Sequence, residues 1–185
     1  MKKFAPFLAM LLLAGAGAGV RAADRPGKYA DASALPVALS NDFQFRKTKL
    51  FLLDTAPPKA QGSKLRSFSK GSAGADASIS FERSYRLFGA VTALDQRQRF
   101  GHYFDFFWRG KRDSNVIVRL EYRQQKLRSF VQAREVPYAH GGGYHVTEFA
   151  VIGDDFLDDG HIIAWRCLLV ANGRIVAEDR SYLWR

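Results

Sequence analysis

The chain has 185 residues, of which 47% are apolar and 14% aromatic, and it carries a formal net charge of +10. This composition excludes an intrinsically disordered chain, and the single cysteine excludes both an intrachain disulfide framework and a cysteine-rich zinc module. No nucleophile, base and orienting group occur together in a catalytic motif. We therefore expect a folded protein with no catalytic residues and no cofactor.

The first 22 residues have the pattern of a secretory signal peptide. Two lysines precede an apolar stretch over residues 4–20, and the triplet at 20–22 fits a signal-peptidase site. The stretch is short for a membrane span, so we predict cleavage after Ala22, with an uncleaved anchor as the alternative. Ala16 stands where a lipobox would need cysteine, so no lipid anchor is expected there. We expect an exported protein, periplasmic or extracellular, without a transmembrane span after cleavage.

Cleavage would remove three basic residues and no acid, leaving 25 basic and 18 acidic residues and a net charge of +7. Outside the cytoplasm, a positive field meets anionic lipid headgroups, lipopolysaccharide or acidic glycans rather than nucleic acid. We therefore expect anionic envelope lipids or glycans, or another envelope protein, as partners, and no nucleic acid. A charge excess that only keeps the protein soluble is the alternative.

The mature chain begins with a polar segment and a basic strand. Residues 23–41 have few large apolar side chains and are predicted to form a flexible leader, whereas residues 42–54 fit an edge strand protected by lysines. Prolines and a Gly/Ser/Ala run within residues 54–77 predict a long surface loop. The basic residues of this strand and loop form the candidate polyanion-binding site: Arg46, Lys47, Lys49, Lys59, Lys64, Arg66 and Lys70.

From residue 78 onward, we expect strands separated by turns. The predicted strands lie near 79–85, 100–108, 116–123, 127–136, 144–152, 161–171 and 175–184. Residues 109–115 fit a polar hairpin loop, and Asn172-Gly173 is the strongest two-residue hairpin signal. These elements predict one all-β domain over 42–185, an antiparallel β-sandwich of the immunoglobulin or fibronectin-like kind, with a small β-barrel as the alternative.

Two loops contain residues capable of chemistry. Asp154, Asp155, Asp158 and Asp159 could ligate calcium, but their spacing is not that of an EF-hand loop and also fits a turn, with Phe156 packing on the sheet. The tetrapeptide that begins at His140 looks like an oxyanion-hole loop. Because the chain has no Gly-x-Ser-x-Gly elbow, we interpret it as a flexible glycine loop.

For the remaining residues that could serve a function, a structural role is the favoured interpretation. Most aromatic side chains between Tyr103 and Trp108 are expected to pack inside, with a sugar-stacking platform as the alternative. Cys167 is expected to be a buried thiol, and the charged residues between Arg119 and Glu135 are expected on a solvated sheet face.

Together these features predict an exported, non-enzymatic β-sandwich protein that serves as a binding or structural module of the cell envelope. One alternative is a protein that binds envelope lipids or polyanions. The other is a hydrolase built from His102, Asp105 and His145, which requires their side chains to converge in one pocket.

Overall fold

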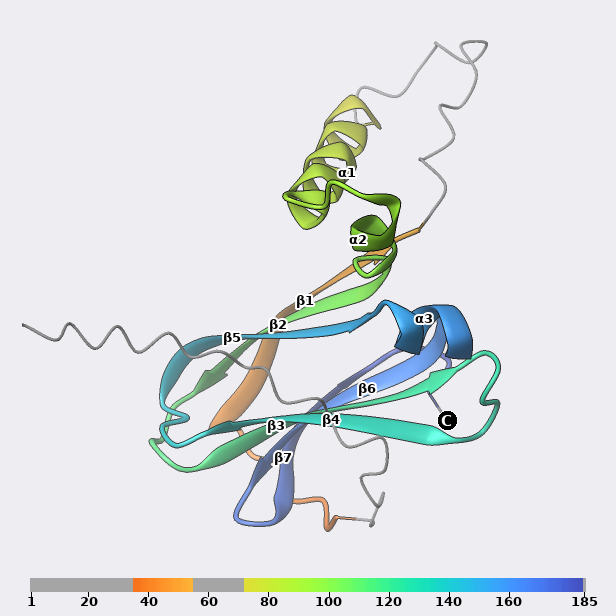
Figure 1. Ribbon diagram of the computed structural model, residues 1–185. Coiled ribbons are helices and arrows are strands. Elements are labelled where there is room, and N and C mark those ends of the chain that lie inside the picture. Colours follow the sequence, from red (N-terminus) through yellow and green to blue (C-terminus); the bar gives the residue numbers. More distant parts are fainter. Residues whose placement is uncertain (1–34, 55–71, 185) are drawn as a thin grey trace, which may run out of the picture.

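Residues 35–54 and 72–184 are described by the computed structural model, which forms an antiparallel β-sandwich not closed into a barrel (Figure 1). One sheet has the order β1-β2-β5, from β1 (Phe43–Leu53), β2 (Gly101–Gly110) and β5 (Gly143–Ile152). The other has the order β4-β3-β6-β7, from β4 (Val131–Tyr138), β3 (Val116–Gln124), β6 (Ile162–Ala171) and β7 (Arg174–Arg180). The predicted all-β sandwich is confirmed.

The strand order resembles that of a constant-type immunoglobulin sandwich, except that the fourth strand pairs with the third. Because β2 and β3 belong to different sheets, residues 111–115 cross from one sheet to the other, and the hairpin predicted at 109–115 was wrong. The hairpin predicted at Asn172-Gly173 was right. Both residues have positive φ, 52° and 70°, as a tight turn between β6 and β7 requires.

The core lies between the sheets and follows the period of two along each strand. Val116, Val118, Leu120 and Tyr122 of β3 are each at most 1% exposed, as their alternation predicted. They face the aromatic side chains Phe104, Phe106 and Trp108 of β2, together with Phe149 and Val151 of β5. Cys167 is also fully buried, as expected, and this burial raises the pKa of its thiol well above the usual value.

The outer face of β3 is not the solvated surface predicted for it. Arg119 and Glu121 are only 6% and 3% exposed, and their side chains are joined at 2.8 Å. Arg166 of β6 reaches Glu121 at 2.6 Å, and its guanidinium lies 5.1 Å from the Trp184 ring. The C-terminal residues therefore cover this charged face, an arrangement that the alternation along one strand does not reveal.

Part of the predicted leader is paired. The backbone N–H groups of Ala38 and Ser40 donate to the carbonyls of Ile175 and Val176 at 2.8 and 3.0 Å. Leu35 packs on the apolar outer side of β6 and β7. Residues 35–41, predicted as part of a flexible leader, are therefore held at β7 by backbone hydrogen bonds, while Val37 and Leu39 remain exposed.

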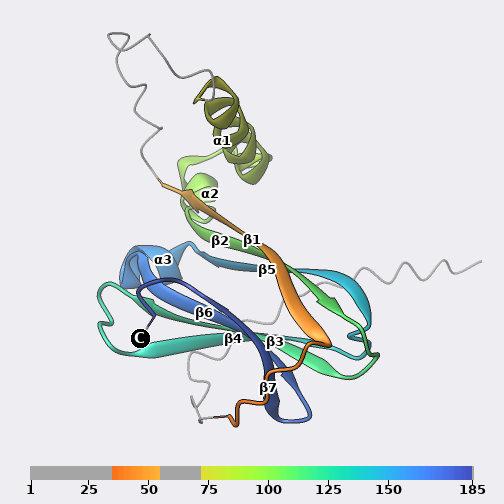
Figure 2. The same ribbon diagram turned by 180° about the vertical axis from the view of Figure 1, so that it is seen from behind.

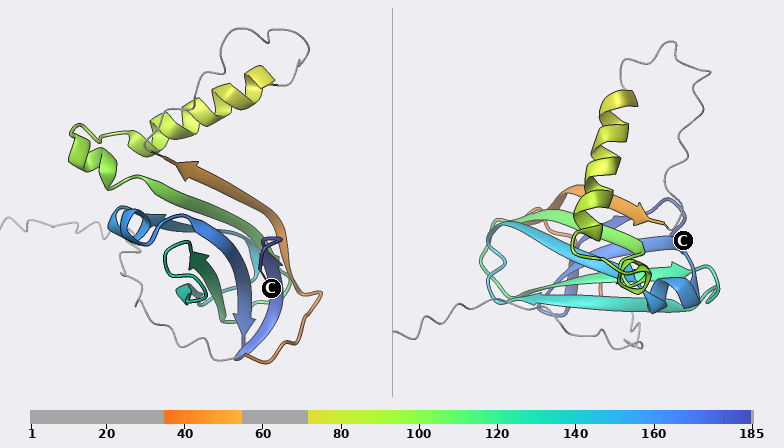
Figure 3. Two further views of the ribbon diagram at one scale, coloured as in Figure 1. Left: turned by 90° about the vertical axis from the view of Figure 1, so that its right-hand side faces the viewer. Right: turned by 45° about the horizontal axis from the view of Figure 1, so that its top comes forward.

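The described residues form three helices, α1 (Ser72–Leu87), α2 (Ala93–Arg97) and α3 (Asp154–Asp159). α1 replaces the strand predicted at 79–85 and the last part of the loop predicted at 54–77. It projects from the end of the sandwich next to β1 and β2 (Figures 2 and 3). α3 replaces the predicted turn, with Phe156 buried against the sheet as expected.

Candidate functional site: the outer face of β1-β2-β5

The outer face of the three-stranded sheet gathers basic and aromatic side chains. Because Phe106 and Trp108 of β2 point into the core, Phe107 and Arg109 point outward. Phe107 lies between Lys47 of β1 and Val146 of β5. Arg109 lies between Gln44 and Tyr144 in the next row. The register therefore places cations from two strands on one surface.

Two of these cations lie over aromatic rings. The Lys49 ammonium is 5.2 Å from the centroid of the Phe107 ring, and the Arg109 guanidinium is 5.0 Å from that of Tyr144. Lys49, Arg109 and Tyr144 are all exposed. A cation held over an aromatic face keeps its outer side free for an anion, so the pairs leave the charges positioned and accessible. We call Lys47, Lys49, Phe107, Arg109 and Tyr144 the cationic platform.

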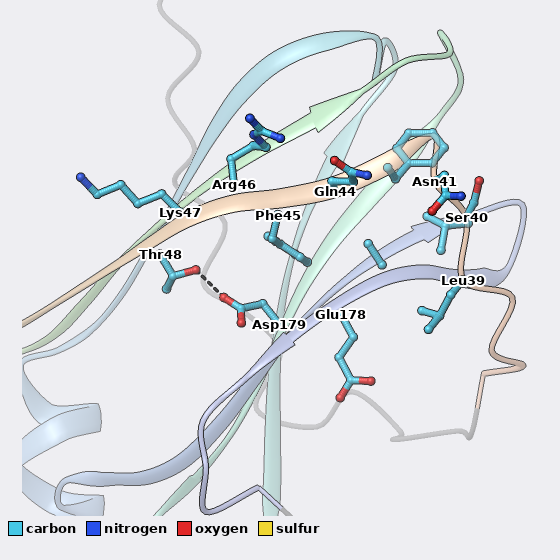
Figure 4. Close-up of a pocket in the computed structure, with 13 residues that line it drawn as sticks. Leu39, Ser40, Asn41, Gln44, Phe45, Arg46, Lys47, Thr48, Glu178 and Asp179 are labelled. Atoms are coloured by element: carbon cyan, nitrogen blue, oxygen red, sulfur yellow. Dashed lines mark hydrogen bonds between the residues drawn. The ribbon is translucent and has the colours of Figure 1, made fainter.

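β1 directs its basic residues away from the sandwich interior. Its pairing with β2 shifts register between Phe45 and Lys47, which places Arg46 in a β-bulge. Arg46 and Lys47 point outward from β1, whereas Phe45 and Thr48 point toward β7 (Figure 4). The bulge and the lysines protect this edge strand from pairing with other chains, and they also place positive charge beside the platform.

A groove of about 560 Å³ lies between the edges of β1 and β7. The Thr48 hydroxyl donates to the Asp179 carboxylate across it at 2.5 Å, and the Phe45 ring packs edge-on against Phe106 at its floor. Glu178 and Asp179 line the β7 side (Figure 4). The acids of this wall make the groove mixed in charge, so the cationic surface is the outer face and not the groove.

The platform ends at a row of acids. Asp105 and Glu148 are directly opposite each other on β2 and β5, beside Lys49. Like charges at this spacing destabilise a sheet unless they are compensated. Arg86 of α1 lies 3.7 Å from Asp105 and supplies positive charge at this end. The net positive part of the face is therefore the half that contains Lys47 and Arg109.

Only part of the candidate polyanion site can be located. Arg46, Lys47 and Lys49 lie on β1, while Lys59, Lys64, Arg66 and Lys70 lie outside the described residues. The polyanion site predicted from the sequence did not include Arg109 and Tyr144. They join the platform only through the pairing of β2 with β5, and no motif in the sequence signals that register.

The four aspartates lie on or at the end of α3, and two of them have cationic partners. Asp155 accepts from Arg134 at 2.8 Å, and Asp154 lies 3.9 Å from Arg97. Arg134 itself points inward from β4 and also donates to the Ala150 carbonyl. Across residues 35–54 and 72–184, no three metal-binding side chains come together. Asp155 therefore serves to join α3 to β4.

The three residues of the hydrolase hypothesis do not converge. His102 faces the core near Phe156, whereas Asp105 faces outward on the same strand. His145 lies opposite Trp108, six residues and about 20 Å along β2 from His102. The His102 ring nitrogen accepts from the Ile162 N–H at 3.1 Å, and burial lowers the pKa of His102 to about 4. His102 is therefore a neutral structural acceptor at neutral pH.

Polar groups of the glycine loop that begins at His140 form hydrogen bonds with residues 113 and 114. The Gly141 N–H donates to the Ser114 carbonyl at 2.9 Å, and the Gly142 N–H points to the Asp113 carboxylate at 3.4 Å. His140 is bonded to the same carboxylate at 3.0 Å. These contacts join the loop to the crossing segment between the sheets, and two of its amides are thus already engaged.

The fold and this surface define an antiparallel β-sandwich with an exposed cationic and aromatic face. No family model, curated protein or solved structure matches the chain. Within the part of the chain that the structure describes, no helix has the length and apolar character needed to cross a membrane.

Proposed function

We propose that the protein is an exported, non-enzymatic binding module of the cell envelope that binds acidic glycans through the cationic platform. The observation that carries this proposal is the placement of Lys49 and Arg109 over Phe107 and Tyr144 on one exposed sheet face. Export rests on the signal-peptide pattern in the first 22 residues.

The physical basis is an array of weak, positioned charges. Neighbouring strands are about 4.8 Å apart, and outward positions repeat about every 7 Å along a strand. An anionic polymer can contact several such cations at once, so individually weak contacts add as avidity. Cations already held over rings lose less conformational freedom on binding, which improves the affinity of each contact.

The test compares two variants with the same change of charge. The platform variant carries Lys47→Gln, Lys49→Gln and Arg109→Gln, and the control carries Lys126→Gln, Arg128→Gln and Arg174→Gln, which are exposed residues elsewhere. Affinity for heparin is measured as the acidic-polysaccharide probe, with dextran as the neutral one. We expect the platform variant to lose at least about ten-fold in affinity, and the control much less.

Binding of both variants is also measured at low and high salt and with anionic lipid vesicles in place of heparin. Charge-driven binding should weaken strongly between low and high salt, because exposed charges are screened within about 8 Å at physiological ionic strength. Equal losses in the two variants, or binding indifferent to salt, would mean that the charge excess only keeps the protein soluble. Platform-dependent binding to anionic vesicles but not to heparin would assign the platform to lipid headgroups instead.

A further inference from the structure

α1 is attached to the sandwich through its charged side. The Arg86 guanidinium lies 4.4 Å from the centroid of the Tyr103 ring, and Arg83 donates to the Asp54 carbonyl at 2.9 Å. Leu87 packs on the buried cluster at this end of the sheet. The anchoring contacts therefore come from the last turns of the helix and from one side of it.

The opposite side of α1 is aromatic and faces solvent. Phe81 and Tyr85 lie four residues apart on one face of α1, and Phe88, the residue directly after the last residue of the helix, continues that spacing by three. Their exposed fractions are 71%, 63% and 85%. A surface helix of a globular protein normally buries its apolar face and exposes its charged one, so α1 has this arrangement reversed.

The apolar surface continues into the connection to α2. Val91 is 87% exposed and Leu94 is 66% exposed. We call Phe81, Tyr85, Phe88, Val91 and Leu94 the elbow surface. It belongs to the C-terminal half of α1, the connection and α2, at the end of the sandwich from which α1 projects (Figure 3). Apolar side chains gathered on a projection and exposed to this degree mark an interaction site.

A hollow with an arginine at its rim adjoins the elbow surface. It has a volume of about 480 Å³ and is lined by Tyr85, Arg86, Phe88, Gln98, Arg99, Tyr103 and Ile152. Arg99 is exposed and forms no ion pair with the described residues. Arg86 is paired with Glu82 at 2.8 Å, and Asp95 is held by the N-cap of α2. Arg99 is thus the charge available to a ligand there.

We propose that the elbow surface binds an anionic lipid bilayer, with its apolar side chains among the acyl chains and Arg99 against a lipid phosphate. Charge complementarity favours this occupant, because Arg99 lies at the rim of the adjoining hollow without an ion-pair partner among the described residues, and the phosphates of an anionic bilayer supply the opposite charge. Exposed aromatic and aliphatic side chains beside basic ones are the composition that binds the membrane interface. The inference uses other residues than the cationic platform and does not depend on it.

The first test measures binding to vesicles of phosphatidylglycerol and phosphatidylcholine. Phe88→Ser with Val91→Ser should reduce vesicle partitioning at least about ten-fold. The matched control, Tyr182→Ser with Leu183→Ser, removes two exposed apolar side chains near the C-terminus, outside the elbow surface, and should change vesicle partitioning less than two-fold. Arg99→Gln should reduce the preference for anionic over pure phosphatidylcholine vesicles.

The second test asks whether the elbow enters the bilayer. The Phe88→Trp protein should show a blue-shifted emission with vesicles and quenching by lipids brominated on the acyl chain, whereas the Tyr182→Trp protein should show neither. The inference is overturned if Phe88→Trp binds without quenching, or if the elbow and control pairs partition equally. It is also overturned if lipid-free protein is a dimer that Phe88→Ser with Val91→Ser converts to a monomer. Unchanged heparin affinity in the elbow variant separates this result from the platform proposal.

Discussion

The indole N–H of Trp108 donates to the Thr147 hydroxyl at 2.9 Å, and both side chains are at most 1% exposed. The Tyr138 hydroxyl lies 2.9 Å from the same oxygen, so Thr147 connects β2 and β5 with β4 of the other sheet. A buried indole N–H without an acceptor costs the full desolvation of that group.

Thr147→Val should therefore lower the free energy of unfolding by about 1–3 kcal/mol, although valine has nearly the same shape. Urea denaturation measures this loss. Thr48→Val is the control, because Thr48 is only half-buried in the groove and should cost less. A loss below about 0.5 kcal/mol for Thr147→Val would show that water or a rearranged side chain replaces the acceptor.

Trp165→Ala should lower the free energy of unfolding by about 3 kcal/mol. The Trp165 ring packs edge-on against Phe104 and Phe106 at 5.8 and 5.6 Å, in agreement with the inward position predicted for it. The side chain is half-buried rather than fully buried, so the loss belongs at the lower end for a core tryptophan. Chemical denaturation showing a change below about 1 kcal/mol would contradict this packing role.

Stability should fall as the pH drops from about 6.5 toward 4, because of His102. The folded-state pKa of His102 is about 4, whereas an unfolded histidine titrates near 6.5, so only the unfolded chain binds this proton in that interval. The unfolded state gains the proton and the folded state does not, so acid favours unfolding by at most about 3 kcal/mol from this residue. Stability curves of wild type and His102→Gln between pH 7 and 4 should converge at low pH. Parallel curves would show that His102 does not titrate in this way.

Arg86→Met should loosen α1 without unfolding the sandwich. The substitution removes the guanidinium over Tyr103 and the cation beside Asp105, which then lies opposite Glu148 without that counter-charge. Limited proteolysis should cut α1 several-fold faster, while the denaturation midpoint of the β-sheets changes little. Arg97→Met, at a weaker and more exposed ion pair, is the control. Equal cleavage rates in the two variants would argue against Arg86 as the anchor.

The sequence predicted the parts of the fold that depend on one strand at a time. The predictions of the inward face of β3 and of the turn at Asn172-Gly173 were right, because side-chain alternation and turn preferences depend on residues close together in the sequence. The strand predicted at 79–85 was wrong, because Ile79 and Phe81 fit the period of two of a strand. The spacing of Phe81, Tyr85 and Phe88 fits a helix, but these side chains are exposed and so do not form the buried apolar stripe by which a helix is usually recognised.

Only the β1 residues of the cationic platform could be predicted from the sequence, again because local patterns within one strand can be read and pairing between strands cannot. Lys47 and Lys49 are adjacent on one strand and were recognised as a basic cluster. Arg109 and Tyr144 are far apart in the sequence and meet only when β2 and β5 pair in the observed register. Register between strands depends on tertiary packing, which periodicity within one strand does not encode.

The most direct test of the central proposal is an NMR titration of the protein with a heparin oligosaccharide. We predict that the largest backbone and side-chain shifts fall on the outward positions of β1, β2 and β5, centred on Lys47, Phe107 and Arg109, and that the Lys47→Gln, Lys49→Gln, Arg109→Gln variant loses them. Shifts centred on the outer face of β4-β3-β6-β7, or spread evenly over exposed basic residues, would contradict a glycan-binding site on the cationic platform.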